Sequence, residues 1–100
     1  MTIAEFENII PCVGLGDDPS FCALGLAGEV GELANLAKKE WRDGVHLLPE
    51  IRLEAADVFI YLILYARARG FSLEKAILDK LEILSVRRPD WWAKENFDDN

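Results

Sequence analysis

Two pairs of carboxylates constrain the fold of this chain more than any other feature of its sequence. Glu29 and Glu32 are three residues apart, as are Glu54 and Asp57, and both pairs lie in largely apolar stretches. Residues i and i+3 of an α-helix lie on one face, so each pair projects from one side of its helix. Two such helices packed antiparallel bring four carboxylates together, and their mutual repulsion calls for a cation between them. The pattern predicts a helical scaffold with a divalent metal site.

The ligand chemistry favours Mg²⁺, with Mn²⁺ as the second candidate, because carboxylate oxygens suit hard cations. His46 is the single histidine, which argues against a di-iron bundle built from Glu-x-x-His pairs. Cys12 and Cys22 are ten residues apart, without metal-type spacing, and are interpreted as reduced thiols. From the spacing alone, two solvated acidic stripes on amphipathic helices are an equally good interpretation. The apolar surroundings of Glu29, which hold no basic neighbour, favour the metal site.

The remaining sequence predicts an all-α protein of about four helices in a single domain, residues 1–100. The expected helices cover residues 2–10, 20–42, 50–69 and 72–87. Asp18 and Ser72 have the side chains of N-caps, while Gly44 and Gly70 have the character of C-terminal caps. Residues 14–18 are expected to form a loop, and residues 90–100 a tail in which Trp91 and Trp92 dock on the body or on a neighbouring subunit.

Two features of the helices predict close packing and a second subunit. Gly25, Gly28 and Gly31 recur every three residues and form a smooth strip that another helix or a ligand can approach. Residues 58–66 are apolar on every side, and a helix of that kind is buried on every side. A 100-residue domain meets that demand most easily at a subunit interface. We therefore expect a homodimer or homotetramer.

Charge and hydropathy exclude several classes of protein. The formal net charge of −7 argues against DNA or RNA as a partner, because phosphate backbones require a basic surface. The uninterrupted apolar run at 58–66 is too short to cross a bilayer, and residues 1–7 do not resemble a signal peptide. The chain is expected to be cytoplasmic and to bind no membrane.

Basic residues near the acidic pairs are candidates for phosphate binding. Lys38, Lys39 and Arg42 follow the first pair on the same predicted helix, and Arg42 can grip two oxygens at once. Compensation of the helix dipole is the simpler interpretation for one of the three. Lys80 shares a helix face with Arg87, where a solvated surface is equally plausible.

These motifs together resemble the MazG-like all-α nucleoside triphosphate pyrophosphohydrolases. The resemblance covers residues 21–89 and rests on an ordered set: Gly28-Glu29-Val30-Gly31-Glu32, Lys38-Lys39, Arg42-Asp43-Gly44, Glu54-Ala55-Ala56-Asp57, Lys80-Leu81 and Arg87-Arg88-Pro89. It implies a MazG-like helical bundle completed by dimerisation, with the motif-bearing core at 20–89. It also implies Mg²⁺-dependent hydrolysis of an NTP or dNTP to the monophosphate and pyrophosphate, which removes unwanted nucleotides from the pool.

The resemblance assigns roles residue by residue. It makes Glu29, Glu32, Glu54 and Asp57 the metal ligands. A water activated by the metal would attack the phosphate chain. Many members carry a second, adjacent glutamate where this chain has Gly28. Where that glutamate helps to activate water, this chain would depend on Glu29, on another acid such as Glu50, or on metal-bound hydroxide.

On the substrate side, the resemblance places Lys80 at the phosphates, together with Arg42 and either Lys38 or Lys39, of which Lys39 is our candidate. Many members carry an asparagine where this chain has Ile77, so recognition of the sugar or base differs here. Tyr61 is our candidate for stacking on the base, although helical aromatic residues more often belong to a core. Two alternatives remain: a non-catalytic helical oligomerisation module, and a pyrophosphohydrolase of a metabolite that is not a nucleotide.

Overall fold

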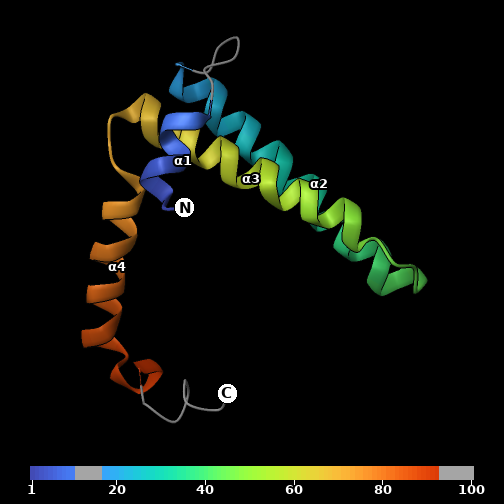
Figure 1. Ribbon diagram of the computed structural model, residues 1–100. Helices are drawn as coiled ribbons and strands as arrows, with labels where there is room; N and C mark the ends of the chain where they lie inside the picture. Colours follow the sequence, from blue (N-terminus) through green and yellow to red (C-terminus); the bar gives the residue numbers. More distant parts are fainter. Residues whose placement is uncertain (11–16, 93–100) are drawn as a thin grey trace.

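The computed structural model describes residues 1–10 and 17–92, which form helices and, within those ranges, no strand. The elements are α1 (Ile3–Ile9), α2 (Pro19–Asp43), α3 (Leu48–Arg69), α4 (Leu73–Arg87) and the short 3-10 helix η1 (Pro89–Trp92). Figure 1 shows α2 and α3 side by side along their lengths as an antiparallel pair, from which α4 diverges. The predicted all-α class is confirmed. Cys12 and most of the predicted loop at 14–18 lie outside the described residues.

The ends of α2 follow the capping rules that its sequence indicates. Asp18 Oδ1 accepts the backbone N–H groups of Ser20 at 2.8 Å and Phe21 at 3.3 Å, which satisfies donors that a helix start leaves open. Pro19 occupies the first turn, where its missing N–H costs nothing. Gly44 ends the helix with φ of 69°, in the left-handed region.

The start of α3 depends on a side chain from α2. Leu47 is the N-cap residue of α3, and a leucine side chain cannot accept a hydrogen bond. Instead Glu40 Oε2 accepts the backbone N–H of Leu47 at 2.7 Å. This contact fixes the return of the chain at the end of the α2–α3 pair. The helix begins at Leu48, two residues before its predicted start at residue 50, and Pro49 occupies its second position.

A buried apolar cluster lies where α1 meets α3 and α4. Ile63, Ala66 and Leu73 are buried there, and Ile3, Ile10, Phe59 and Leu62 pack against them. The ring of Phe6 meets that of Phe59 edge to face, with centroids 5.8 Å apart. The short α1 therefore completes the core at the corner between α3 and α4, where Figure 1 places it.

Polar contacts hold α1 at the same corner. Arg67 Nη1 donates to the carbonyl oxygens of Glu7 at 2.9 Å and Ile10 at 2.8 Å, both at the end of α1. In the other direction, Glu7 Oε1 accepts the backbone N–H of Leu73 at 3.3 Å. Each contact joins an open helix terminus to a charged side chain of a neighbouring element.

Beyond this corner, much apolar surface stays uncovered within one chain. In the segment 58–66, Ile63, Leu64 and Ala66 are buried, whereas Ile60 is 36% exposed. On α4 only Leu73 is buried, and exposed apolar side chains continue along that helix: Ile77, Leu78, Leu81, Ile83 and Val86. The complete burial expected for the segment 58–66 is not reached in a single chain.

The tail ends, among the described residues, in a small aromatic cluster. The rings of Trp91 and Trp92 stack with centroids 6.4 Å apart, and the guanidinium of Arg88 lies 4.5 Å from the Trp91 ring centroid. Arg88 also pairs with Asp90 at 3.2 Å. Both tryptophans keep more than 40% of their surface exposed. The predicted docking of this pair on another surface stays a prediction.

Candidate metal centre

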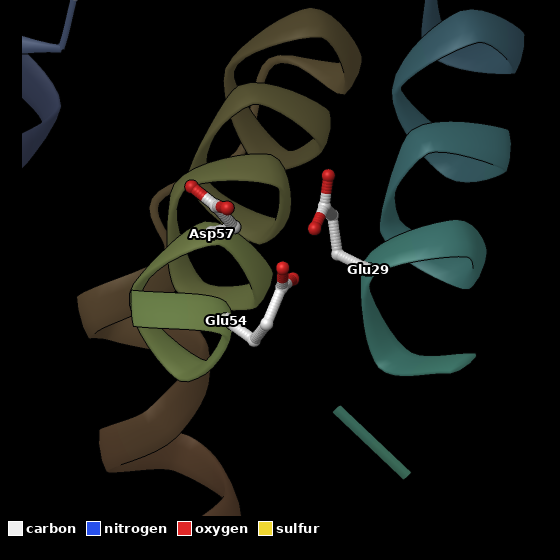
Figure 2. Close-up of side chains that lie close together, drawn as sticks. All are labelled: Glu29, Glu54 and Asp57. Atoms are coloured by element: carbon white, nitrogen blue, oxygen red, sulfur yellow. The ribbon is translucent and has the colours of Figure 1, made fainter. Parts of the chain in front are cut away.

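Three of the four predicted carboxylates meet between α2 and α3. One oxygen each from Glu29, Glu54 and Asp57 lies within 4.8 Å of the others. Figure 2 shows Glu29 extending from α2 toward Glu54 and Asp57, which project from α3. All three residues are half-buried. The i, i+3 spacing places the two α3 carboxylates on the face that α2 covers.

Two carboxylate oxygens in this cluster are buried without a hydrogen-bond donor from the described residues. Glu29 Oε2 and Glu54 Oε2 are buried and find no hydrogen-bond partner among the described residues. A buried, ionised carboxylate oxygen without a partner is strongly disfavoured, unless a cation supplies the missing interaction. Three converging carboxylates with open oxygens therefore fit a divalent ion such as Mg²⁺ or Mn²⁺, which bind hard oxygen ligands.

The crowding of these carboxylates also shifts the pKa of Glu54. The pKa of Glu54 rises from its ordinary 4.5 to about 7. The first cause is a hydrogen bond to Glu29 that only the protonated form of Glu54 can donate; desolvation and the nearby charge of Glu32 act in the same direction. Without a metal, Glu54 therefore keeps its proton to a higher pH than an ordinary glutamate does.

The fourth predicted ligand, Glu32, lies at the edge of the cluster. It is exposed, and its carboxylate is not one of the three that lie within 4.8 Å of one another. It is nevertheless close enough to raise the pKa of Glu54. Helix geometry rotates Glu32 by about 60° from Glu29, toward the rim of the α2–α3 interface. Its role as a ligand stays a prediction.

The predicted phosphate-binding residues are spread over two arms of the molecule. Lys39 and Arg42 are exposed on the last turns of α2, and Arg42 is paired with Asp43 by two hydrogen bonds of 2.8 and 2.9 Å. Lys80 is exposed on α4, which diverges from α2 and α3 (Figure 1). One chain therefore does not gather these three cations around the acidic cluster.

The other two predicted site residues lie on α3, one turn to each side of the acidic pair. Glu50 is exposed in the first turn, four residues before Glu54. Tyr61 follows Asp57 by four residues and is half-buried, with its ring against the backbone of Gly25. Their roles as base and as stacking surface stay predictions. The glycine strip predicted a close approach to α2, and the ring contact is such an approach at Gly25. The sequence did not identify Tyr61 as the partner.

Fold and site together define an all-α protein with a carboxylate centre suited to a divalent cation. The sequence matches the family model of the MazG nucleotide pyrophosphohydrolase domain over residues 18–92, three quarters of the chain. The chain belongs to this family. Comparisons with curated proteins and with solved structures find no significant match. Among the described helices, none is long and apolar enough to cross a membrane.

Proposed function

We propose that this protein is a Mg²⁺-dependent nucleoside triphosphate pyrophosphohydrolase, which converts an NTP or dNTP to the monophosphate and pyrophosphate. The observation that carries the proposal is the cluster of Glu29, Glu54 and Asp57, with two buried oxygens that lack partners. The cluster lies within a MazG nucleotide pyrophosphohydrolase domain. A phosphate chain carries its own negative charge, so it would approach such an acidic site only together with cations.

The three clustered carboxylates, joined by Glu32 at the rim, would hold the ion. When bound, Mg²⁺ neutralises phosphate charge and makes water a better nucleophile. The side chain that accepts the proton of the attacking water must lie within reach of that water and must not be occupied by the metal. Glu50 is our first candidate, because it lies one turn before Glu54 on the same helix and is not part of the carboxylate cluster. Glu29 is the second candidate, although holding the ion would occupy its carboxylate.

A second copy of the chain would complete the site. The apolar side chains from Ile77 to Val86 on α4 need a cover, and burying them against another chain is strongly favourable. Such a dimer would bring Lys80 of one copy toward the phosphates held by the other, while Lys39 approaches from the same chain. Arg42 would exchange its bond with Asp43 for the outer phosphate.

Light scattering tests the assembly. At micromolar concentration we expect the mass of a homodimer or homotetramer, and Leu81→Asp, which places a charge in the exposed stripe of α4, should shift the mass toward one chain. Glu82→Gln changes an exposed neighbour on the same helix and serves as the control. A monomeric wild-type chain would rule out the completed site.

A product screen tests the activity. The full chain is incubated with the eight common NTPs and dNTPs plus Mg²⁺, and the products are separated by ion exchange. We expect a monophosphate and pyrophosphate in equal amounts from at least one of them. Metabolites that contain a pyrophosphate but are not nucleotides are screened in the same way, and product from these alone would favour the metabolite enzyme. Absence of any product, with no thermal shift from Mg²⁺ and a nucleotide analogue, would favour the non-catalytic module.

Isosteric variants connect the activity to the site. Asp57→Asn and Glu54→Gln keep the shape of each side chain and remove a charge, so we expect kcat/KM to fall at least about a hundredfold. Glu50→Gln is expected to lower kcat, because it removes the proposed proton acceptor, while Mn²⁺ binding is retained. Turnover near wild type in both Asp57→Asn and Glu54→Gln would remove the metal assignment.

A further inference from the structure

We propose that Tyr61 is a positioning residue whose ring, seated on the bare backbone of Gly25, sets the separation of α2 and α3 at the metal centre. The proposal rests on the metal site of the proposed function and adds to it a residue that needs to contact neither metal nor substrate. The three glycines of α2, at positions 25, 28 and 31, lie in different surroundings.

Only one of the three glycines is closely approached by the described part of the chain. A Cβ atom placed on Gly25 would overlap the ring of Tyr61, reaching 2.7 Å from Cδ1 and 2.8 Å from Cζ. Cβ atoms on Gly28 and Gly31 would meet no described atom within 4 Å. Steps of three residues turn the strip by about 60° each, so it leaves the α3 face after its first member. Gly25 is therefore the glycine that the helix pair requires.

The ring contact lies one helical turn from the carboxylates. Gly25 precedes Glu29 by four residues, and Tyr61 follows Asp57 by four. In an antiparallel pair, these two steps run in the same direction along the interface. The contact thus forms the layer beside the acidic cluster, about 6 Å along the helix axes. An aromatic ring held against a helix backbone is a stiff spacer, because both surfaces are incompressible at this range.

Spacing matters here because the three carboxylates reach one ion from two helices. Glu29 is carried by α2, and Glu54 and Asp57 are carried by α3. If the helices separate, Glu29 leaves the other two carboxylates; if they close further, like charges whose oxygens already lie within 4.8 Å of one another are pressed together. Mg²⁺ and Mn²⁺ tolerate little variation in ligand distance, so a fixed separation favours binding.

The test measures Mn²⁺ affinity by the loss of the free-ion EPR signal, together with thermal unfolding of metal-free chains, on full-length variants. Gly25→Ala should weaken Mn²⁺ binding about tenfold or more and lower the unfolding temperature. Gly28→Ala and Gly31→Ala are matched controls, since each adds the same methyl group to the same helix. They should bind Mn²⁺ within about twofold of wild type and unfold at the same or a higher temperature.

Substitutions at Tyr61 distinguish the contribution of the ring from that of its hydroxyl group. Tyr61→Phe keeps the spacer and should keep wild-type Mn²⁺ affinity. The double variant G25A/Y61L removes the overlap and should recover most of the affinity that Gly25→Ala loses, or recover folding if Gly25→Ala does not fold. Each of these outcomes supports the spacer role with a readout that catalysis does not affect.

Four results would overturn the proposal: wild-type Mn²⁺ affinity in Gly25→Ala, an equal loss in both control glycines, a tenfold loss in Tyr61→Phe, or a double variant no better than Gly25→Ala. Mn²⁺ binding without any hydrolytic product would leave the spacer role in place and contradict the proposed activity. A wild-type chain that takes up no Mn²⁺ would contradict both the metal site and the spacer role.

Discussion

Arg67 Nη1, on α3, donates to the carbonyl oxygen of Ile10 at 2.8 Å and so closes the C-terminal end of α1. The same nitrogen donates to the carbonyl oxygen of Glu7 at 2.9 Å. Helix α1 precedes the residues 18–92 that match the family domain, yet its apolar side chains complete the cluster around Ile63. One arginine thus joins an element outside the family domain to the centre of the core.

We expect Arg67→Met to destabilise the protein by about 2 kcal/mol, because two carbonyl groups lose a charged donor while the aliphatic volume is retained. Arg69→Met, an exposed arginine two residues further along α3, is the control and should change stability little. Urea unfolding followed by circular dichroism measures both. Equal losses in the two variants would show that the contact with α1 contributes nothing specific.

The metal-free protein should lose stability as the pH rises from about 4.5 to 7. Glu54 has a pKa of about 7 in the folded chain and 4.5 ordinarily, so the folded state holds the extra proton in this range. The stabilisation from that proton is complete below pH 4.5 and disappears as the pH passes 7. Thermal unfolding in a chelator should follow this trend in the wild type more steeply than in Glu54→Gln. Parallel pH profiles would contradict the shifted pKa.

The affinity for Mg²⁺ should change with pH in the opposite direction. Binding requires ionised Glu54, so apparent affinity rises between pH 5 and 7 and then levels off. Calorimetric titration at pH 5.5 and 8 measures the difference, and proton release at the lower pH should accompany binding. Affinity that is independent of pH over this range would place the ion away from Glu54.

Removing the Glu40 carboxylate should weaken the α2–α3 turn. Glu40→Ala leaves the N–H of Leu47 without its 2.7 Å acceptor, a loss comparable to removing an N-cap, about 1 kcal/mol. Asn35→Ala changes an exposed polar residue of the same helix and is the control. Hydrogen exchange should show faster exchange at the start of α3 in Glu40→Ala alone. Unchanged protection there would contradict the capping role.

The proposed dimeric site makes a prediction for Lys80. Lys80→Ala should lower kcat/KM about tenfold to a hundredfold through loss of a charged hydrogen bond to phosphate, with Mn²⁺ affinity unchanged. Lys75→Ala is the matched control, since Lys75 is exposed on the same helix and pairs with Asp79 at 2.7 Å. A Lys80→Ala enzyme with wild-type kinetics would exclude this residue from the substrate site.

The sequence by itself determined the elements and most of their ends. Asp18, Gly44, Gly70 and Ser72 cap helices where their side chains or backbone freedom predict it, because capping depends on residues within one turn. The i, i+3 spacing also predicted which carboxylates share a face. It did not predict that Glu29 meets Glu54 and Asp57 while Glu32 stays at the rim, since that depends on how α2 and α3 are aligned.

Contacts between distant segments were decided by the tertiary structure alone. Glu40 caps the start of α3, Arg67 caps the end of α1, and the ring of Tyr61 lies against Gly25. In each case the two partners come from different turns of the chain. Such contacts depend on the separation and rotation of whole helices, which local periodicity leaves free. The carboxylate pairs therefore predicted a metal site from the sequence, while the packing of α2 on α3 decided which of their oxygens face one another.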